Sequence, residues 1–157
     1  MKKFELTNEF ITNMFGTKLF RIRALVEFGD VEAGELGGYV EKESNLGHDD
    51  NAWVYDNAWV YGNARVCGDA RVCSDEDYAY AHGFGSVNRT TTFFRLKDGG
   101  VGVRCGCFYG TLAQFRDKIR ETHGETKKAQ EYLMLADLME LRFEEDENEV
   151  GNRKYVE

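Results

Sequence analysis

The hydrophobic and polar positions between residues 48 and 77 repeat with a period of six. An α-helix cannot keep one face on this period, because six residues turn it by about 600° and place successive units on different sides. A strand can, because residues two apart share a side until a turn redirects the chain. We therefore expect short strands and turns with two buried columns, the valines Val54, Val60, Val66 and Val72 and the alanines Ala52, Ala58, Ala64 and Ala70.

This repeat resembles the hexapeptide repeat of left-handed parallel β-helices, in which an aliphatic residue and a small residue four positions later line a triangular prism. The resemblance covers residues 48–77, and Val40 and Leu46 suggest an earlier, irregular unit. It implies a short left-handed parallel β-helix of about two to three coils within residues 40–89. So brief a solenoid needs caps at both ends, because its end strands would otherwise be open to pairing.

The chain is therefore predicted to have three regions. Residues 1–39 would form an N-terminal cap, in which the alternation over residues 19–25 indicates a strand. Residues 40–89 would form the β-helix, and residues 90–157 would form a β-hairpin and two C-terminal helices. The predicted fold class is mixed β/α.

The hairpin is indicated by two runs of β-branched and aromatic residues, 90–96 and 101–108, around the turn sequence at 97–100. Thr111 and Gln114 then form the Thr-x-x-Gln pattern of a capping box, which predicts a helix that ends at Gly124.

A second helix is predicted over about residues 125–143, since apolar residues recur there on one helical stripe. We expect this stripe to pack on the first helix, the hairpin or a partner subunit. It consists of Ala129, Tyr132, Leu133, Ala136, Met139 and Phe143.

Composition narrows the possible functions. The 157 residues carry 20 basic and 28 acidic side chains, a net charge of −8, which disfavours direct binding to nucleic acid. No apolar run approaches the roughly 20 residues of a membrane helix, and no signal peptide is evident, so we expect no membrane partner and a cytoplasmic location. An acidic run, residues 144–149, is expected to be a solvated end or a partner-binding tail.

The sequence does not favour an enzyme. The four cysteines have no common zinc spacing, so we expect reduced thiols and neither a metal site nor a cofactor. No phosphate-binding loop or nucleophile motif is present, and we assign no catalytic residue. A hexapeptide-repeat acyltransferase stays a further alternative, in which His82 would be the base.

If valine and alanine face inward, aromatic and arginine side chains alternate outward, and these residue types are enriched in binding hot spots. Terminal helices or a second subunit could also cover them. The candidate ligand- or partner-binding residues are Trp53, Tyr55, Trp59, Tyr61, Arg65, Arg71, Arg89 and Arg95.

The order of motifs is similar to that of small phage and prophage proteins of Gram-positive bacteria. The resemblance lies in Leu36–Glu43, the Asn-Ala-Trp-Val-Tyr repeats, Thr91–Arg95, Gly106–Leu112 and Glu121–Gly124. It implies a phage or prophage origin and a host cytoplasmic location. We expect a homo-oligomeric, non-enzymatic binding protein, an anti-defence factor that inhibits a host immune protein. The alternative is a sponge that sequesters a small anionic signalling nucleotide between the aromatic and arginine side chains.

Overall fold

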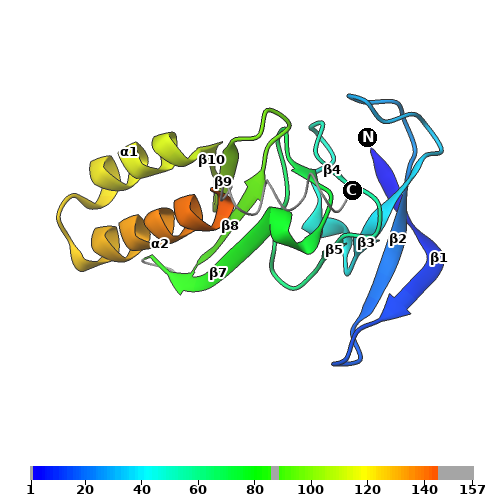
Figure 1. The fold of residues 1–157 in the computed structure, drawn as a ribbon, viewed down its shortest axis with the longest axis horizontal. Coiled ribbons are helices and arrows are strands. Elements are labelled where there is room, and N and C mark those ends of the chain that lie inside the picture. The colour runs from blue at the N-terminus through cyan, green and yellow to red at the C-terminus, as the bar shows by residue number, and fades with distance from the viewer. Residues whose placement is uncertain (1, 86–88, 145–157) are drawn as a thin grey trace, which may run out of the picture.

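The structure is a computed structural model that describes residues 2–85 and 89–144. A mixed N-terminal sheet lies at one end, the repeat segment lies in the middle, and a four-stranded sheet with two helices forms the other end (Figure 1). The strands are β1 (Phe4–Thr12), β2 (Lys18–Ala24), β3 (Leu36–Val40), β4 (Trp53–Val54), β5 (Trp59–Val60), β6 (Arg71–Val72), β7 (Tyr78–Phe84), β8 (Arg89–Arg95), β9 (Val101–Cys105) and β10 (Phe108–Thr111). The helices are α1 (Leu112–His123) and α2 (Lys127–Phe143), and two short 3-10 turns span Glu43–Asn45 and Asp75–Asp77.

The N-terminal sheet has the order β1-β2-β3-β5. Strands β1, β2 and β3 pair antiparallel, and β3 then pairs parallel with β5 through Tyr39 and Val40. The predicted strand over residues 19–25 is confirmed as β2, and Leu19, Ile22 and Ala24 are buried.

The repeat segment buries its two columns as predicted. All four valines are at most 1% exposed and all four alanines at most 3% exposed. A left-handed residue occupies the third position of each of three units, with φ of 53° at Asp56 and 66° at Gly62 and Gly68. These residues turn the chain every six positions and so keep valine and alanine on the inner side.

The predicted left-handed parallel β-helix is wrong. Within residues 2–85 and 89–144, parallel pairing is limited to two ladders of two residue pairs each, β3 with β5 and β4 with β6, and one isolated bridge between Leu46 and Val66. Antiparallel strands adjoin the segment on both sides, so the sheets are antiparallel or mixed. The period of six determined which side chains are buried, but ladders this short do not build sustained coils.

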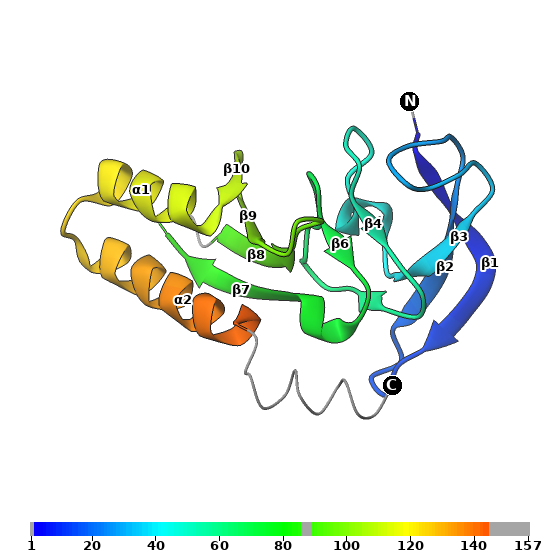
Figure 2. The same cartoon turned by 45° about the horizontal axis from the view of Figure 1, so that its top comes forward.

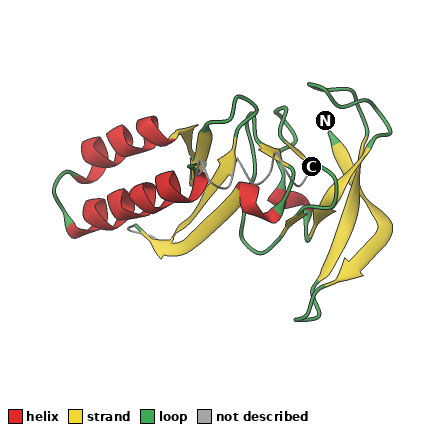
Figure 3. Ribbon diagram, in the orientation of Figure 1, coloured by secondary structure: helices red, strands yellow, loops and turns green. Residues whose placement is uncertain are grey.

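The C-terminal region matches its predicted elements. Strands β8 and β9 form the expected antiparallel hairpin within a sheet of order β10-β9-β8-β7. Helix α1 begins after Thr111 with the expected capping box and ends at Gly124. Helix α2 covers most of the predicted span, and five of the six stripe residues are buried, with Leu133 partly buried against the same core. Figure 3 shows the two helices beside this sheet, away from the N-terminal strands.

The C-terminal sheet lies between the two helices and the repeat segment (Figure 2). It separates two hydrophobic cores. Phe93 of β8 packs in the core under α1 and α2, whereas the next residue, Phe94, packs in the core of the repeat segment. The sheet therefore has one face toward the helices and one toward the repeats. No helix among the described residues has the length and apolar character needed to span a membrane.

Candidate functional site

A cavity of about 360 Å³ lies where the repeat-facing side of the C-terminal sheet meets the repeat segment. Its walls come from the turn after β3, from the repeats and from strands β7, β8 and β9. We call it the basic pocket. It is lined by Lys42, Ser44, Asn63, Arg65, His82, Arg89, Thr90, Arg104 and Gly106.

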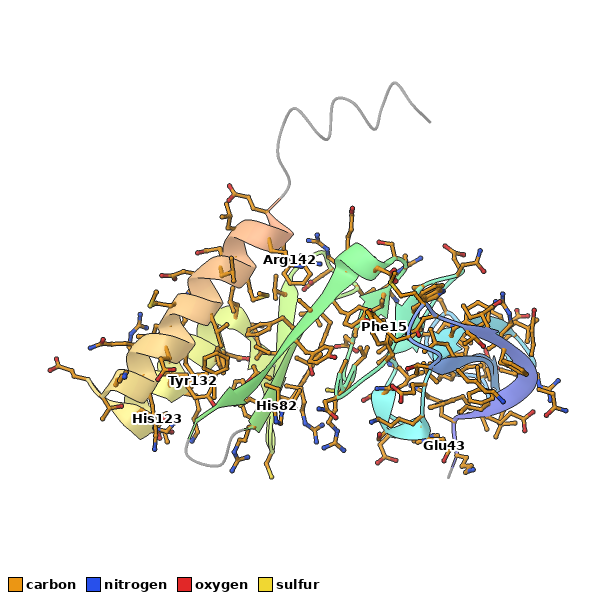
Figure 4. The ribbon with its side chains drawn as sticks, turned by 90° about the horizontal axis from the view of Figure 1, so that it is seen from below. Phe15, Glu43, His82, His123, Tyr132 and Arg142 are labelled. Atoms are coloured by element: carbon orange, nitrogen blue, oxygen red, sulfur yellow. The ribbon has the colours of Figure 1, made fainter. Side chains whose placement is uncertain are left out.

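Hydrogen bonds fix the walls of the basic pocket to one another. His82 and Thr90 are directly opposite in the β7–β8 ladder, and His82 Nδ1 lies 2.7 Å from Thr90 Oγ1. The backbone N–H of Arg65 donates to Thr92 Oγ1 at 3.0 Å, which joins the repeat to the sheet. Figure 4 shows His82 on the sheet and apart from His123 and Tyr132, which lie together on the helices.

The repeat wall is held by a buried amide. Asn45 is fully buried, and its Nδ2 donates to the carbonyls of Gly62 and Ala64 at 3.1 and 2.9 Å. Its Oδ1 accepts from the backbone N–H of Lys42 at 2.9 Å. The backbones that carry Lys42 and Arg65 are therefore held in one fixed arrangement before any ligand arrives.

The basic pocket has an excess of positive charge. Lys42, Arg65, Arg89 and Arg104 line it, and no acidic side chain of the described residues does. Within residues 2–85 and 89–144, none of these four cations forms a salt bridge. In a chain of net charge −8, four unpaired cations around one cavity form a local site for an anion.

Two of the arginines are oriented by the β9–β10 turn. Arg104 Nε donates to the Gly106 carbonyl at 2.7 Å, and its Nη1 lies 3.8 Å from Cys67 Sγ. Gly106 has a φ of 59°, and a Cβ at this position would collide with the Arg89 guanidinium. Glycine is favoured there by the left-handed backbone conformation, and its missing side chain lets Arg89 approach closely.

A larger cavity of about 540 Å³ has mixed charge. Arg71 and Lys97 line it together with Asp30, Asp69 and Asp98. Lys97 Nζ is 3.2 Å from an Asp30 carboxylate oxygen, so one of its two cations is already paired. An anion there would meet three carboxylates, and this cavity is the weaker anion site despite its size.

Trp53 does not lie on the surface, and the prediction that it faces outward is wrong. It is fully buried, with its ring edge-on to Phe4 at 6.3 Å and to Phe28 at 5.3 Å between ring centroids. Strand β1 and the loop after β2 cover it. Cys67 is likewise buried, at 6% exposed, and burial raises the pKa of its thiol.

The other predicted residues are spread over several places. Arg65 and Arg89 line the basic pocket, whereas Tyr55 and Arg71 line the mixed-charge cavity, with the Arg71 guanidinium 4.9 Å from the Tyr55 ring centroid. Tyr61 is 37% exposed, Trp59 is half-buried and neither lines the basic pocket.

Arg95 is engaged elsewhere. Its Nε lies 3.8 Å from an Asp77 carboxylate oxygen, and its guanidinium covers the Phe143 ring at 5.2 Å from the centroid. The eight residues therefore do not form the single aromatic and arginine surface that the sequence suggested.

Sequence reasoning missed Lys42 and Arg104 as binding residues and considered His82 only as a base. One signal for Arg104 was available, because it alternates with Val103 and Cys105 on a predicted strand and so faces away from the helices. Nothing in the sequence placed Lys42 near it.

The cysteines offer no metal centre in the described part of the chain. Cys67, Cys73, Cys105 and Cys107 are free thiols. No group of three His, Cys, Asp or Glu side chains within residues 2–85 and 89–144 is placed to hold a metal ion.

No protein-family model matches the chain, and no curated protein is significantly similar to it. These comparisons give no support to the resemblance to phage and prophage proteins, and the antiparallel and mixed sheets contradict the β-helix family. The geometry of the basic pocket is therefore the basis for a function.

Proposed function

We propose that this protein binds a small anionic ligand, one that carries phosphate or carboxylate groups, in the basic pocket. The observation that carries the proposal is the cluster of Lys42, Arg65, Arg89 and Arg104 around one cavity with no acidic lining residue. Guanidinium groups suit this role because their planar N–H fork matches two oxygens of a phosphate or carboxylate.

The size of the cavity supports a ligand rather than a lone ion. Its volume of about 360 Å³ is at the lower end of the roughly 300–1,000 Å³ of small-molecule sites. Asn63, Ser44 and Thr90 add neutral donors and acceptors to the cations, so the walls can also bind hydroxyl or amide groups. A nucleotide that is held without turnover fits this proposal.

We place this function in the cytoplasm, and the protein in a homo-oligomer. Four free cysteines, of which Cys107 is exposed, suit a reducing compartment.

The other hypotheses have weaker support. An inhibitor of a host protein stays a prediction, but the aromatic surface on which it was based is interrupted by the burial of Trp53. An acyltransferase also stays a prediction. The ring of His82 bonds to Thr90, and no carboxylate lines the pocket to orient that ring as a base.

The proposal is tested by isothermal titration of the purified chain with pyrophosphate, ATP and citrate. Arg65→Gln and Lys42→Gln each remove one charge from the pocket lining, and each should weaken binding at least about tenfold. Arg71→Gln is the matched control, because Arg71 is exposed, forms no salt bridge within the described residues and lines the other cavity. It should bind as tightly as the unmodified chain.

Mass spectrometry of the released ligand should show it chemically intact. Failure of all three probes to bind at millimolar concentration would refute the proposal. Equal losses of affinity in Arg71→Gln and Arg65→Gln would do the same, because they would indicate attraction by general surface charge.

A further inference from the structure

Helix α2 has a second apolar stripe on the side opposite its core-facing residues. Met134, Leu138 and Leu141 are 71%, 54% and 68% exposed. At about 100° per residue these three lie within a narrow arc, diametrically opposite the buried stripe of Tyr132, Ala136, Met139 and Phe143. Three large apolar side chains on one exposed arc are typical of a docking surface.

Unpaired charges of opposite sign flank this outer stripe. Glu131 and Arg142 are eleven residues apart, about three helical turns, so they lie on the same side of the stripe. Neither forms a salt bridge with any residue of 2–85 or 89–144. Arg142 makes one long hydrogen bond, from Nη2 to the Tyr78 carbonyl at 3.5 Å.

On the other side of the stripe, the acidic side chains of α2 form salt bridges within the chain. Arg116 of α1 pairs with Asp137 and Glu140 of α2, each at 2.9 Å. This side of α2 therefore faces α1, whereas Glu131 and Arg142 lie on the opposite side of the stripe, where they can meet a partner.

We propose that the occupant of the outer stripe is a second copy of this chain, with the two α2 helices packed antiparallel about a two-fold axis. The midpoint between Glu131 and Arg142 lies between residues 136 and 137, and the midpoint of the stripe from Met134 to Leu141 lies between residues 137 and 138. The two midpoints differ by one residue, about 1.5 Å along the helix. One axis therefore brings Met134 of each copy against Leu138 and Leu141 of the other and also brings each Glu131 to the partner's Arg142.

The charges select the antiparallel arrangement. In a parallel pair the two-fold axis would run along the helices and would place Glu131 and Arg142 of the two copies on opposite sides of the interface, so Glu131 could not meet the partner's Arg142. The two-fold axis of the antiparallel pair creates two opposite-charge pairs at once. The stripe is short compared with stable interfaces, so the dimer should be weak and should depend on protein concentration.

The inference names the surface and partner for the self-association proposed above, and it is independent of ligand binding. It is tested by sedimentation equilibrium of the full chain over a range of concentrations. The mass should rise from 18.0 kDa toward twice that value. Leu138→Glu should stay monomeric, while Phe15→Glu, which adds the same charge at an 86% exposed site in the β1–β2 loop, should associate like the unmodified chain.

Charge-reversal variants of Glu131 and Arg142 test the proposed ion pairs directly. Arg142→Glu and Glu131→Arg should each raise the dimer dissociation constant about tenfold, because each creates two like-charge pairs. The double variant Glu131→Arg/Arg142→Glu exchanges the partners and should return the constant to within about threefold of the original. Circular dichroism checks that each variant keeps its helices.

A chain that stays monomeric at all concentrations overturns the inference. So does a dimer that survives Leu138→Glu, or a double variant no better than the single ones. If the monomeric variant Leu138→Glu still binds pyrophosphate, the ligand proposal holds independently of the dimer. If Arg65→Gln loses pyrophosphate binding but still dimerises, the two proposals can fail independently.

Discussion

The ammonium group of Lys3 is buried against the carboxylate of Asp50, with Nζ 3.2 Å from Oδ1. Lys3 is 2% exposed, and its Nζ also donates to the carbonyls of Asp50 and Ala52 at 3.0 and 2.6 Å. Asp50 in turn accepts backbone N–H groups from Ala52 and Gly68 at 3.1 and 2.8 Å. This pair thus joins the N-terminal strand to two successive parts of the repeat segment. Burial lowers the pKa of Lys3, although Asp50 opposes the shift.

The two partners of this pair should respond differently to substitution. Asp50→Asn leaves a buried ammonium without its counter-charge and should lower the free energy of unfolding by about 3 kcal/mol. Lys3→Met removes the charge and keeps the aliphatic volume, while Asp50 keeps two backbone donors and partial exposure, so the loss should be no more than about 1.5 kcal/mol. Urea denaturation of both variants measures the difference. Equal losses would contradict the asymmetry.

Stability should fall steeply above pH 10. Burial raises the pKa of Tyr78 and of Tyr132 well above the ordinary value of 10.0. The folded protein then keeps these protons after the unfolded chain has lost them, so the stabilisation is present below pH 10 and is lost as the pH rises. Lys3 acts in the opposite sense, because its pKa is lowered and its contribution improves as the pH approaches 10.5.

The contribution of Tyr78 to the pH dependence of stability is measured by replacing it with phenylalanine. Tyr78→Phe should make the alkaline fall in unfolding free energy shallower by about 1.4 kcal/mol per pH unit, the value of one proton. Denaturant titrations at several pH values between 9 and 11 give the two slopes. Parallel curves for Tyr78→Phe and the unmodified chain would show that Tyr78 ionises equally easily in both states.

Gly37 on β3 is required by close packing. A Cβ at this position would lie 2.6 Å from the Val54 carbonyl oxygen, 2.7 Å from Trp53 Cζ2 and 2.8 Å from Ile22 Cγ1. Because the carbonyl belongs to the backbone, Gly37→Ala can be accommodated only if the repeat moves away from β3, and we expect a loss of about 2 kcal/mol. Leu36→Ala is the control, since Leu36 is 54% exposed and should cost under about 0.5 kcal/mol. Thermal unfolding measures both, and a melting temperature unchanged in Gly37→Ala would contradict this packing.

The helices could be predicted from sequence because their signals are local. Thr111 Oγ1 accepts the Gln114 N–H at 3.2 Å, and Gln114 Oε1 accepts the Thr111 N–H at 2.9 Å, so four consecutive residues contain the whole helix start. The signal for the hairpin of β8 and β9 was equally local, because two strand-forming runs flank a short turn sequence. The repeat was predictable in its burial, since period alone decides which side chains share a face.

The strand pairing of the repeats and the position of the candidate site could not be predicted from the sequence, because both depend on contacts between residues far apart in the chain. Whether a short strand pairs parallel or antiparallel depends on which neighbour reaches it, and the two-residue strand β5 pairs parallel with β3, which also pairs antiparallel with β2. Trp53 was predicted to face outward from the alternation of side chains within the repeat. That local pattern contains no information on Phe4, which lies 49 positions earlier in the sequence and packs over the Trp53 ring. The basic pocket joins Lys42, Arg65 and Arg104 from three segments, and no spacing rule connects them.

A negative charge placed in the wall of the basic pocket should weaken anion binding without changing the shape of the site. Asn63 is exposed and lines the pocket, and Asn63→Asp adds a carboxylate with almost no change in volume. At a separation of about 6 Å in a medium of intermediate dielectric, one such charge costs about 1.4 kcal/mol against a singly charged anion. The dissociation constant for pyrophosphate should therefore rise about tenfold or more.

Asn51→Asp is the matched control for this change, because Asn51 is exposed and lines the mixed-charge cavity. It alters the net charge of the protein equally and should leave the affinity within about twofold at physiological salt, since distant surface charges are screened over about 8 Å. Titration calorimetry of both variants at the same ionic strength separates a local effect from a general one. If Asn51→Asp weakens binding as much as Asn63→Asp, pyrophosphate is bound outside the basic pocket.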